Sequence, residues 1–110
     1  MKKYCLALDL KDEPKSIDTY IQWHKNVWPE IEESIKISGI LTMEIYRVEN
    51  RLFMIIHTED DFSFENKKKL DRMNPTVEKW EKLMDDFQQK IPGTTSGEKW
   101  RIMEKIYHLD

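Results

Sequence analysis

Two strand-like stretches separated by only two residues constrain the fold of this chain most strongly. The segments "ILTMEIYRV" at 40–48 and "RLFMIIHT" at 51–58 are rich in apolar side chains, and only "EN" lies between them. Such a pair predicts an antiparallel hairpin, although neither joining residue is glycine. A third stretch, "KYCLALDL" at 3–10, alternates large and small or polar side chains, as a strand with two different faces does. The sequence therefore predicts a β-sheet with at least three strands.

Apolar side chains recur with helical spacing between the first strand and the hairpin. The pattern extends from about residue 16 to residue 35, and Pro29 interrupts it. Because proline is unfavourable inside a helix but favoured in its first turn, we expect two helical pieces, 14–25 and 28–38, with a bend between them. Gly39 follows the second piece and suits a left-handed helix C-terminus.

A second helical region and a last strand follow the hairpin. "NPTVEKWEKLMDDFQQKIP" at 74–92 predicts a helix, with Asn74 as the cap and Pro75 in the first turn. "KWRIMEKIYHL" at 99–109 predicts the last strand. The polar segment 59–72 has no clear pattern, and its "KKK" run predicts a solvated face or a helix end.

The element order βαββαβ predicts an α+β fold of the ferredoxin-like class, with an antiparallel four-stranded sheet. Its helices would cover one face of the sheet. The strands are apolar on both sides, as "FMII" shows, so we expect a second copy to cover the other face. This predicts a homodimer that resembles an α/β barrel. No linker or repeat divides the chain, so residues 1–110 are expected to form a single domain.

Composition excludes several classes of function. The net charge is −3, and acidic residues are interleaved with the lysines, so a nucleic-acid partner is not expected. No apolar stretch approaches the ~20 residues of a membrane helix, so no membrane partner is expected. Cys5 is the only cysteine and is read as a small buried strand residue, so no internal disulfide forms and a cytoplasmic location is expected. His24, His57 and His108 lack paired metal-ligand spacing, so no metal site is expected, and no glycine-rich phosphate loop is present.

One segment places an ionisable ring among aromatic side chains. In "YIQWHKNVWPE" at 20–30, Tyr20 precedes His24 by one helical turn, so both lie on one face that points toward the sheet. A half-buried imidazole can transfer protons. From spacing alone, a packed histidine that is hydrogen-bonded to a backbone carbonyl is the more common arrangement.

Other residues could contribute chemistry, each with a simpler structural explanation. Trp80 lies on the apolar stripe of the 74–92 helix, so it could pack in the core or stack on a sugar ring. Glu81 beside it is by itself a solvated helix residue. Strand carboxylates such as Asp9, Glu44 and Glu104 could act as an acid or base if buried, although any one of them is more often exposed.

Together, several motifs are similar to those of the L-rhamnose mutarotases. They are "Y-x3-H-x3-WPE" at 20–30, "GI-x3-EIYR" at 39–47, "RLFMI" at 51–55, "NP-x-V-x-x-WE-x-LM-x-x-FQ" at 74–88 and "PG-x3-GEKW-x-x-ME-x-I" at 92–106. The resemblance covers almost the whole chain. It implies a dimeric ferredoxin-like enzyme that interconverts the α and β anomers of a 6-deoxy sugar, L-rhamnose or L-fucose, without a cofactor.

The resemblance also implies roles for individual residues. It makes His24 the proton donor and Tyr20 and Trp80 sugar contacts. Met43 and Glu81 occupy pocket positions where the family's enterobacterial members have tyrosine and tryptophan, so the preferred sugar is open. The second proton-transfer group would be Glu104, Asp9 or water.

Two other functions compete with this one. A dimeric domain of this fold can bind haem or another small molecule, or act as a monooxygenase, with His24 as a ligand or site organiser. A regulator that binds sugar without turnover is the third possibility.

Overall fold

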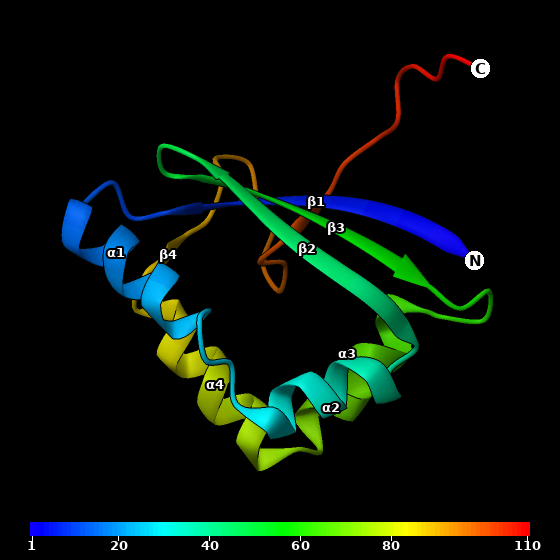
Figure 1. The fold of residues 1–110 in the computed structure, drawn as a ribbon, viewed down its shortest axis with the longest axis horizontal. Helices are drawn as coiled ribbons and strands as arrows, with labels where there is room; N and C mark the ends of the chain where they lie inside the picture. The colour runs from blue at the N-terminus through cyan, green and yellow to red at the C-terminus, as the bar shows by residue number, and fades with distance from the viewer.

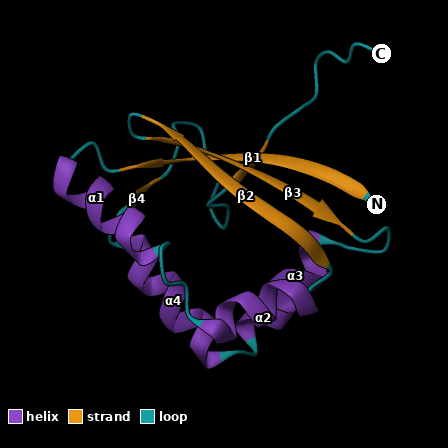
Figure 2. Cartoon of the chain, in the orientation of Figure 1, coloured by secondary structure: helices purple, strands orange, loops and turns teal.

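A single antiparallel sheet lies on one side of the molecule, and four helices cover one of its faces (Figures 1 and 2). We describe it from a computed structural model of residues 1–110. The elements in chain order are β1 (Lys2–Leu10), α1 (Pro14–Trp23), α2 (Pro29–Ile37), β2 (Ile40–Val48), β3 (Arg51–Thr58), α3 (Phe64–Arg72), α4 (Pro75–Asp85), β4 (Gln88–Gln89) and β5 (Arg101–Ile102).

The sheet has the strand order β2-β3-β1-β4, and β5 also pairs with β1. All of these pairs are antiparallel, and Leu6 of β1 lies opposite Met54 of β3. The predicted hairpin is confirmed, with both strands at the predicted residues. The turn contains no glycine; instead Glu49 adopts the left-handed conformation that such a turn requires, with φ of 51°. The predicted α+β, ferredoxin-like fold is therefore confirmed.

The predicted break between the first two helices is also confirmed. Pro29 is the first residue of α2, where its missing N–H costs no hydrogen bond. The helix ends at Ile37 with Ser38 as its C-cap, and Gly39 follows with φ of 103°. A side chain at that φ would be strained, so glycine lets the chain turn from α2 directly into β2.

The segment without a clear pattern contains a helix. The Ser63 side chain accepts a hydrogen bond from the backbone N–H of Asn66 and caps the N-terminus of α3. This helix carries many charges and buries no residue fully, so its apolar stripe is too weak to be recognised by periodicity.

Two predicted ranges were too long, and both corrections concern the edge of β1. The 74–92 helix ends at Asp85, and Gln88–Gln89 then pairs with β1. The 99–109 strand is reduced to Arg101–Ile102, although the Met103 N–H still donates to the Cys5 carbonyl. Two short segments thus share one edge of β1, and the chain leaves the sheet after residue 103.

The helices and the sheet enclose the core on one side only. Leu6, Leu8 and Leu10 of β1 point toward the helices and are buried. Cys5 lies on the opposite face of β1 and is only half-buried, so the prediction that it is buried is wrong for the single chain. No helix has the length and apolar character to cross a membrane.

Candidate active site

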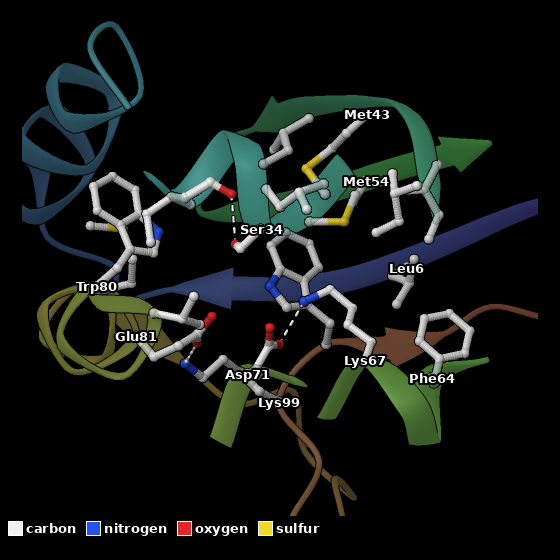
Figure 3. A pocket seen from close by; sticks show the side chains of 18 of the residues that line it. Leu6, Ser34, Met43, Met54, Phe64, Lys67, Asp71, Trp80, Glu81 and Lys99 are labelled. Carbon is white, nitrogen blue, oxygen red and sulfur yellow. Dashed lines mark hydrogen bonds and ion pairs between the residues drawn. The ribbon is translucent and has the colours of Figure 1, made fainter. Parts of the chain in front are cut away.

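A cavity of about 390 Å³ lies between the helices and the sheet. Sixteen of its 26 lining residues are hydrophobic, so it suits a ligand with a large apolar surface. Figure 3 shows how side chains from several elements converge on it. The five residues to which the family resemblance assigns roles all line it: Tyr20, His24, Met43, Trp80 and Glu81.

His24 follows directly after the last turn of α1 and has one ring nitrogen engaged. Its Nδ1 lies 2.9 Å from the backbone carbonyl oxygen of Tyr20. A carbonyl can only accept, so Nδ1 holds a hydrogen and donates it. In the neutral ring Nε2 is then the unprotonated nitrogen, and in the charged ring it is the remaining donor. The ring therefore has the carbonyl bond expected of a packed histidine and also lines the cavity.

Aromatic rings surround the imidazole. The ring of Tyr20 lies 4.3 Å from that of His24 between centroids, and the Trp80 indole lies 5.9 Å away, edge to face. Trp28 packs on Trp80 at 5.1 Å. Trp23 contacts both indoles. These contacts join the end of α1, the start of α2 and the middle of α4. The packed aromatic rings therefore hold the imidazole of His24 in a fixed position.

Tyr20 is the most deeply buried polar side chain near the histidine, with 4% of its surface exposed. Burial raises the pKa of its phenol to about 12; a hydrogen bond with the Gln88 side chain works against this rise, and the charge of Glu81 adds to it. The phenol therefore stays protonated at neutral pH. Gln88 Oε1 is buried at the cavity wall without a partner in the protein.

Glu81 is held in place by a lysine from the segment before β5. Lys99 Nζ lies 2.7 Å from Glu81 Oε2 and 2.6 Å from Asp85 Oδ1. Burial lowers the pKa of Lys99, but the two carboxylates outweigh it, so the pKa is raised overall. Lys99 therefore remains charged and fixes the loop against α4.

Two methionines form part of the wall opposite the helices. Met43 of β2 and Met54 of β3 project into the cavity near Ser34 of α2, as Figure 3 shows. Methionine is flexible and polarisable, so it adapts to irregular apolar groups such as a methyl substituent.

Sequence reasoning missed one polar pair at the cavity. Lys67 of α3 lies 2.7 Å from Asp71, and both line the wall. The prediction that the "KKK" run is a solvated face or helix end is confirmed for Lys68 and Lys69, which are exposed, although Lys68 also lines the cavity. It is wrong for Lys67, because the half-buried Lys67 side chain faces the cavity. The i,i+4 spacing of Lys67 and Asp71 was the available signal, but only the docked position of α3 directs the pair inward.

The strand carboxylates proposed as a second acid or base are not brought to the cavity. Asp9 pairs with Arg51 at 2.8 Å. Glu44 accepts a hydrogen bond from Tyr46, and Glu104 is exposed beyond β5. None of the three lies near His24 in the cavity wall.

Comparison with known proteins agrees with the motifs. The family model described as L-rhamnose mutarotase matches residues 3–109. An L-fucose mutarotase from Xanthomonas campestris pv. campestris is 38% identical over 111 residues, covering 99% of this chain and 89% of that protein.

Two solved structures share the fold. An L-rhamnose mutarotase from Formosa agariphila superposes with a TM-score of 0.72 at 20% identity, over 100% of both chains. A protein described as a dimeric ferredoxin-like protein, from an uncultured marine organism, superposes with a TM-score of 0.57 at 11% identity, over 98% of this chain and 91% of that one. The chain belongs to the L-rhamnose mutarotase family and is a sugar mutarotase, an enzyme that interconverts the two anomers of a reducing sugar.

Proposed function

We propose that the substrate is a 6-deoxyhexose, L-rhamnose in the first place or L-fucose, and that its ring opens and closes in the cavity beside His24. The observation that supports this most is the His24 ring itself, because Nδ1 is bonded to a carbonyl and Nε2 is left for proton transfer. The related Xanthomonas enzyme is an L-fucose mutarotase, which keeps L-fucose as an alternative.

The reaction needs two proton movements. The anomeric hydroxyl loses a proton and the ring oxygen gains one, so the C1–O5 bond breaks and an aldehyde forms. Rotation about C1–C2 and attack of O5 on the other carbonyl face then give the other anomer. We assign the proton donation to Nε2 of the charged His24 ring. With Asp9 and Glu104 outside the cavity, water is the remaining acceptor among the three alternatives. Acid–base catalysis typically contributes ~10²–10⁴-fold, which is sufficient for a reaction that already occurs in water.

The other four residues are assigned to binding. The Tyr20 phenol, protonated at neutral pH, can donate to a sugar oxygen. Trp80 offers an aromatic surface for the C–H face of the sugar, and Met43 offers an apolar contact for its methyl group. Glu81, fixed by Lys99, can accept from a sugar hydroxyl.

We also propose that two copies pair through the outer face of the sheet. Tyr46 and Val48 on that face are 52% and 69% exposed. Beyond β5, Ile106, Tyr107 and Leu109 are 89%, 72% and 76% exposed in the single chain. Apolar surface of this extent usually marks an interface. Sedimentation analysis should give twice the 13.4 kDa chain mass, and a monomer at micromolar concentration would contradict the pairing.

A cytoplasmic location is proposed from the cysteine content. The chain has one cysteine and gains nothing from an oxidising compartment. Fractionation of the producing cells, with detection of the untagged protein, tests this directly.

Saturation-transfer NMR on the unmodified protein tests the substrate. Irradiating the α-anomer H1 of L-rhamnose should reduce the β-anomer signal in proportion to enzyme concentration, with L-fucose measured in parallel. If the enzyme does not raise the anomer exchange rate of either sugar above the rate in buffer, the proposed substrate class is contradicted. The rival functions give other results: a haem protein would show a Soret band on haem titration, and a regulator would bind sugar without exchange.

A further inference from the structure

An ion pair stands in the wall of a cavity that is otherwise largely apolar. Lys67 Nζ and Asp71 Oδ2 of α3 are 2.7 Å apart, and each side chain is only 24% exposed. In Figure 3 both side chains project from α3 into the space bordered by Met54 and Lys99. Neither residue is needed for the proton transfer assigned to His24.

Helix stability does not explain the pair. An i,i+4 pair is more favourable with the acid before the base, whereas here Lys67 precedes Asp71. Asp71 also lies in the last turn of α3, next to its final residue Arg72, where the helix dipole disfavours a carboxylate. Each side chain is in addition only 24% exposed, and the partial removal of two charges from water costs free energy that a single contact offsets only in part.

The pair retains unused hydrogen-bonding capacity toward the cavity. An ammonium has three donors and a carboxylate has two acceptor oxygens, and their mutual contact uses one of each. Adjacent hydroxyl groups of a sugar match this arrangement, because one can accept from the lysine while its neighbour donates to the aspartate.

The position of the pair indicates which hydroxyl groups it would meet. Trp80, which contacts His24, lies well apart from Lys67 and Asp71 along the cavity wall in Figure 3. With the anomeric carbon at His24, the far side of the ring presents the C3 and C4 hydroxyls. L-Rhamnose and L-fucose differ in configuration at C2 and at C4. Of these two centres only C4 lies on the side remote from C1, so a fixed donor and acceptor at this place would distinguish the sugars by the C4 hydroxyl.

We infer that Lys67 and Asp71 bind the adjacent hydroxyl groups on the side of the sugar remote from C1, and thereby determine which deoxyhexose the enzyme accepts. This inference rests on the proposed function for the identity of the substrate. It makes Lys67 and Asp71 specificity-determining residues and not proton-transfer groups.

A charge exchange separates this role from a structural one. In the double variant Lys67→Asp/Asp71→Lys, the pair is kept and takes the more favourable helical order, so the variant should be at least as stable as the wild type. The donor and acceptor are nevertheless displaced by one turn relative to the sugar. The KM or Kd for the preferred sugar should rise ~10- to 100-fold, the loss expected for hydrogen bonds to charged groups, and the ratio between L-rhamnose and L-fucose should shrink.

Lys67→Met should produce the same losses, and Lys69→Met on the exposed side of the same helix is the matched control. Exchange rates by NMR and binding by calorimetry are measured for each protein with both sugars. If the wild type exchanges anomers and the variants keep its KM and its preference between L-rhamnose and L-fucose, the inference is overturned and the proposed function stands. Wild-type binding without exchange would overturn the proposed function, and the Kd values of the variants would then decide the inference. A wild type that neither binds nor exchanges either sugar would overturn both.

Discussion

The imidazole of His24 and the indole of Trp80 meet edge to face, with ring centroids 5.9 Å apart. One ring ends α1 and the other occupies the middle of α4, so this contact joins the first helical region to the last. Trp80 is only 6% exposed, yet it lines the cavity. It is therefore both a core residue and part of the cavity wall, and it contacts the ring of His24 directly.

Truncating Trp80 should affect folding and binding together. Trp80→Ala removes a packed indole and should lower the free energy of unfolding by ~3–5 kcal/mol, measured by urea titration. Trp80→Phe keeps a ring, so it should lose less stability while still raising the KM for the sugar. A loss below ~1 kcal/mol in the alanine variant would mean that the indole is not packed between the helices.

Met43 should favour a methyl group over a hydroxymethyl group. An apolar pocket discriminates against an added hydroxyl by only about 10²-fold, so we expect the wild type to prefer L-rhamnose to L-mannose by ~10- to 100-fold in kcat/KM. Met43→Gln should narrow this ratio, and Met73→Gln, at a residue that is 80% exposed, should not change it. If Met43→Gln has the same ratio of kcat/KM for L-rhamnose and L-mannose as the wild type, Met43 does not contact the methyl group of the sugar.

The Tyr20 phenol should make the protein sensitive to alkali. Its pKa is about 12 in the folded protein, whereas an unperturbed tyrosine has a pKa of 10.0, so the unfolded chain ionises first as pH rises. The stabilisation is complete below pH ~10 and is lost as pH approaches 12, a change of about 2–3 kcal/mol. Urea titrations from about pH 9 to 12 should show this loss in the wild type and a shallower one in Tyr20→Phe. If the free energy of unfolding falls equally with pH in the wild type and in Tyr20→Phe, the phenol of Tyr20 is not buried in the folded protein.

Lys99 should act through Glu81. Lys99→Met releases the carboxylate from its 2.7 Å contact and frees the loop before β5. We expect the KM to rise about three- to tenfold, which corresponds to roughly 1 kcal/mol, with little change in kcat. Lys82→Met, on the exposed surface of α4, is the matched control. If both variants have the same KM, Glu81 does not need the lysine to hold it.

The sequence predicted those parts of the fold that local patterns determine. The hairpin strands, the break at Pro29 and the turn at Gly39 each follow from side-chain period or from a backbone requirement within a few residues. The early end of α4 and the short β5 could not be predicted, because both depend on pairing with β1, which lies more than 75 residues away in sequence.

The residues of the candidate site also fall into those that local patterns predict and those that depend on tertiary packing. Tyr20 and His24 share a helical face, so their common direction was predictable from spacing. The motifs added Trp80, Met43 and Glu81, which the fold brings to the same cavity. Lys67 and Gln88 were not found, since their direction depends on how α3 docks and on where the chain leaves α4.

Proton donation by His24 is tested most directly by comparing His24→Ala with His57→Ala. His57 hydrogen-bonds Thr42 outside the cavity, on the outer face of the sheet, so its variant controls for the loss of an imidazole when sedimentation analysis gives the same mass as for the wild type. Far-UV circular dichroism and urea titration establish that both variants are folded, and saturation-transfer NMR with L-rhamnose and L-fucose then measures anomer exchange. We predict that His24→Ala loses ~10²–10⁴-fold in exchange rate, while His57→Ala keeps the wild-type rate. A folded His24→Ala protein that exchanges anomers as fast as the wild type would contradict the assignment.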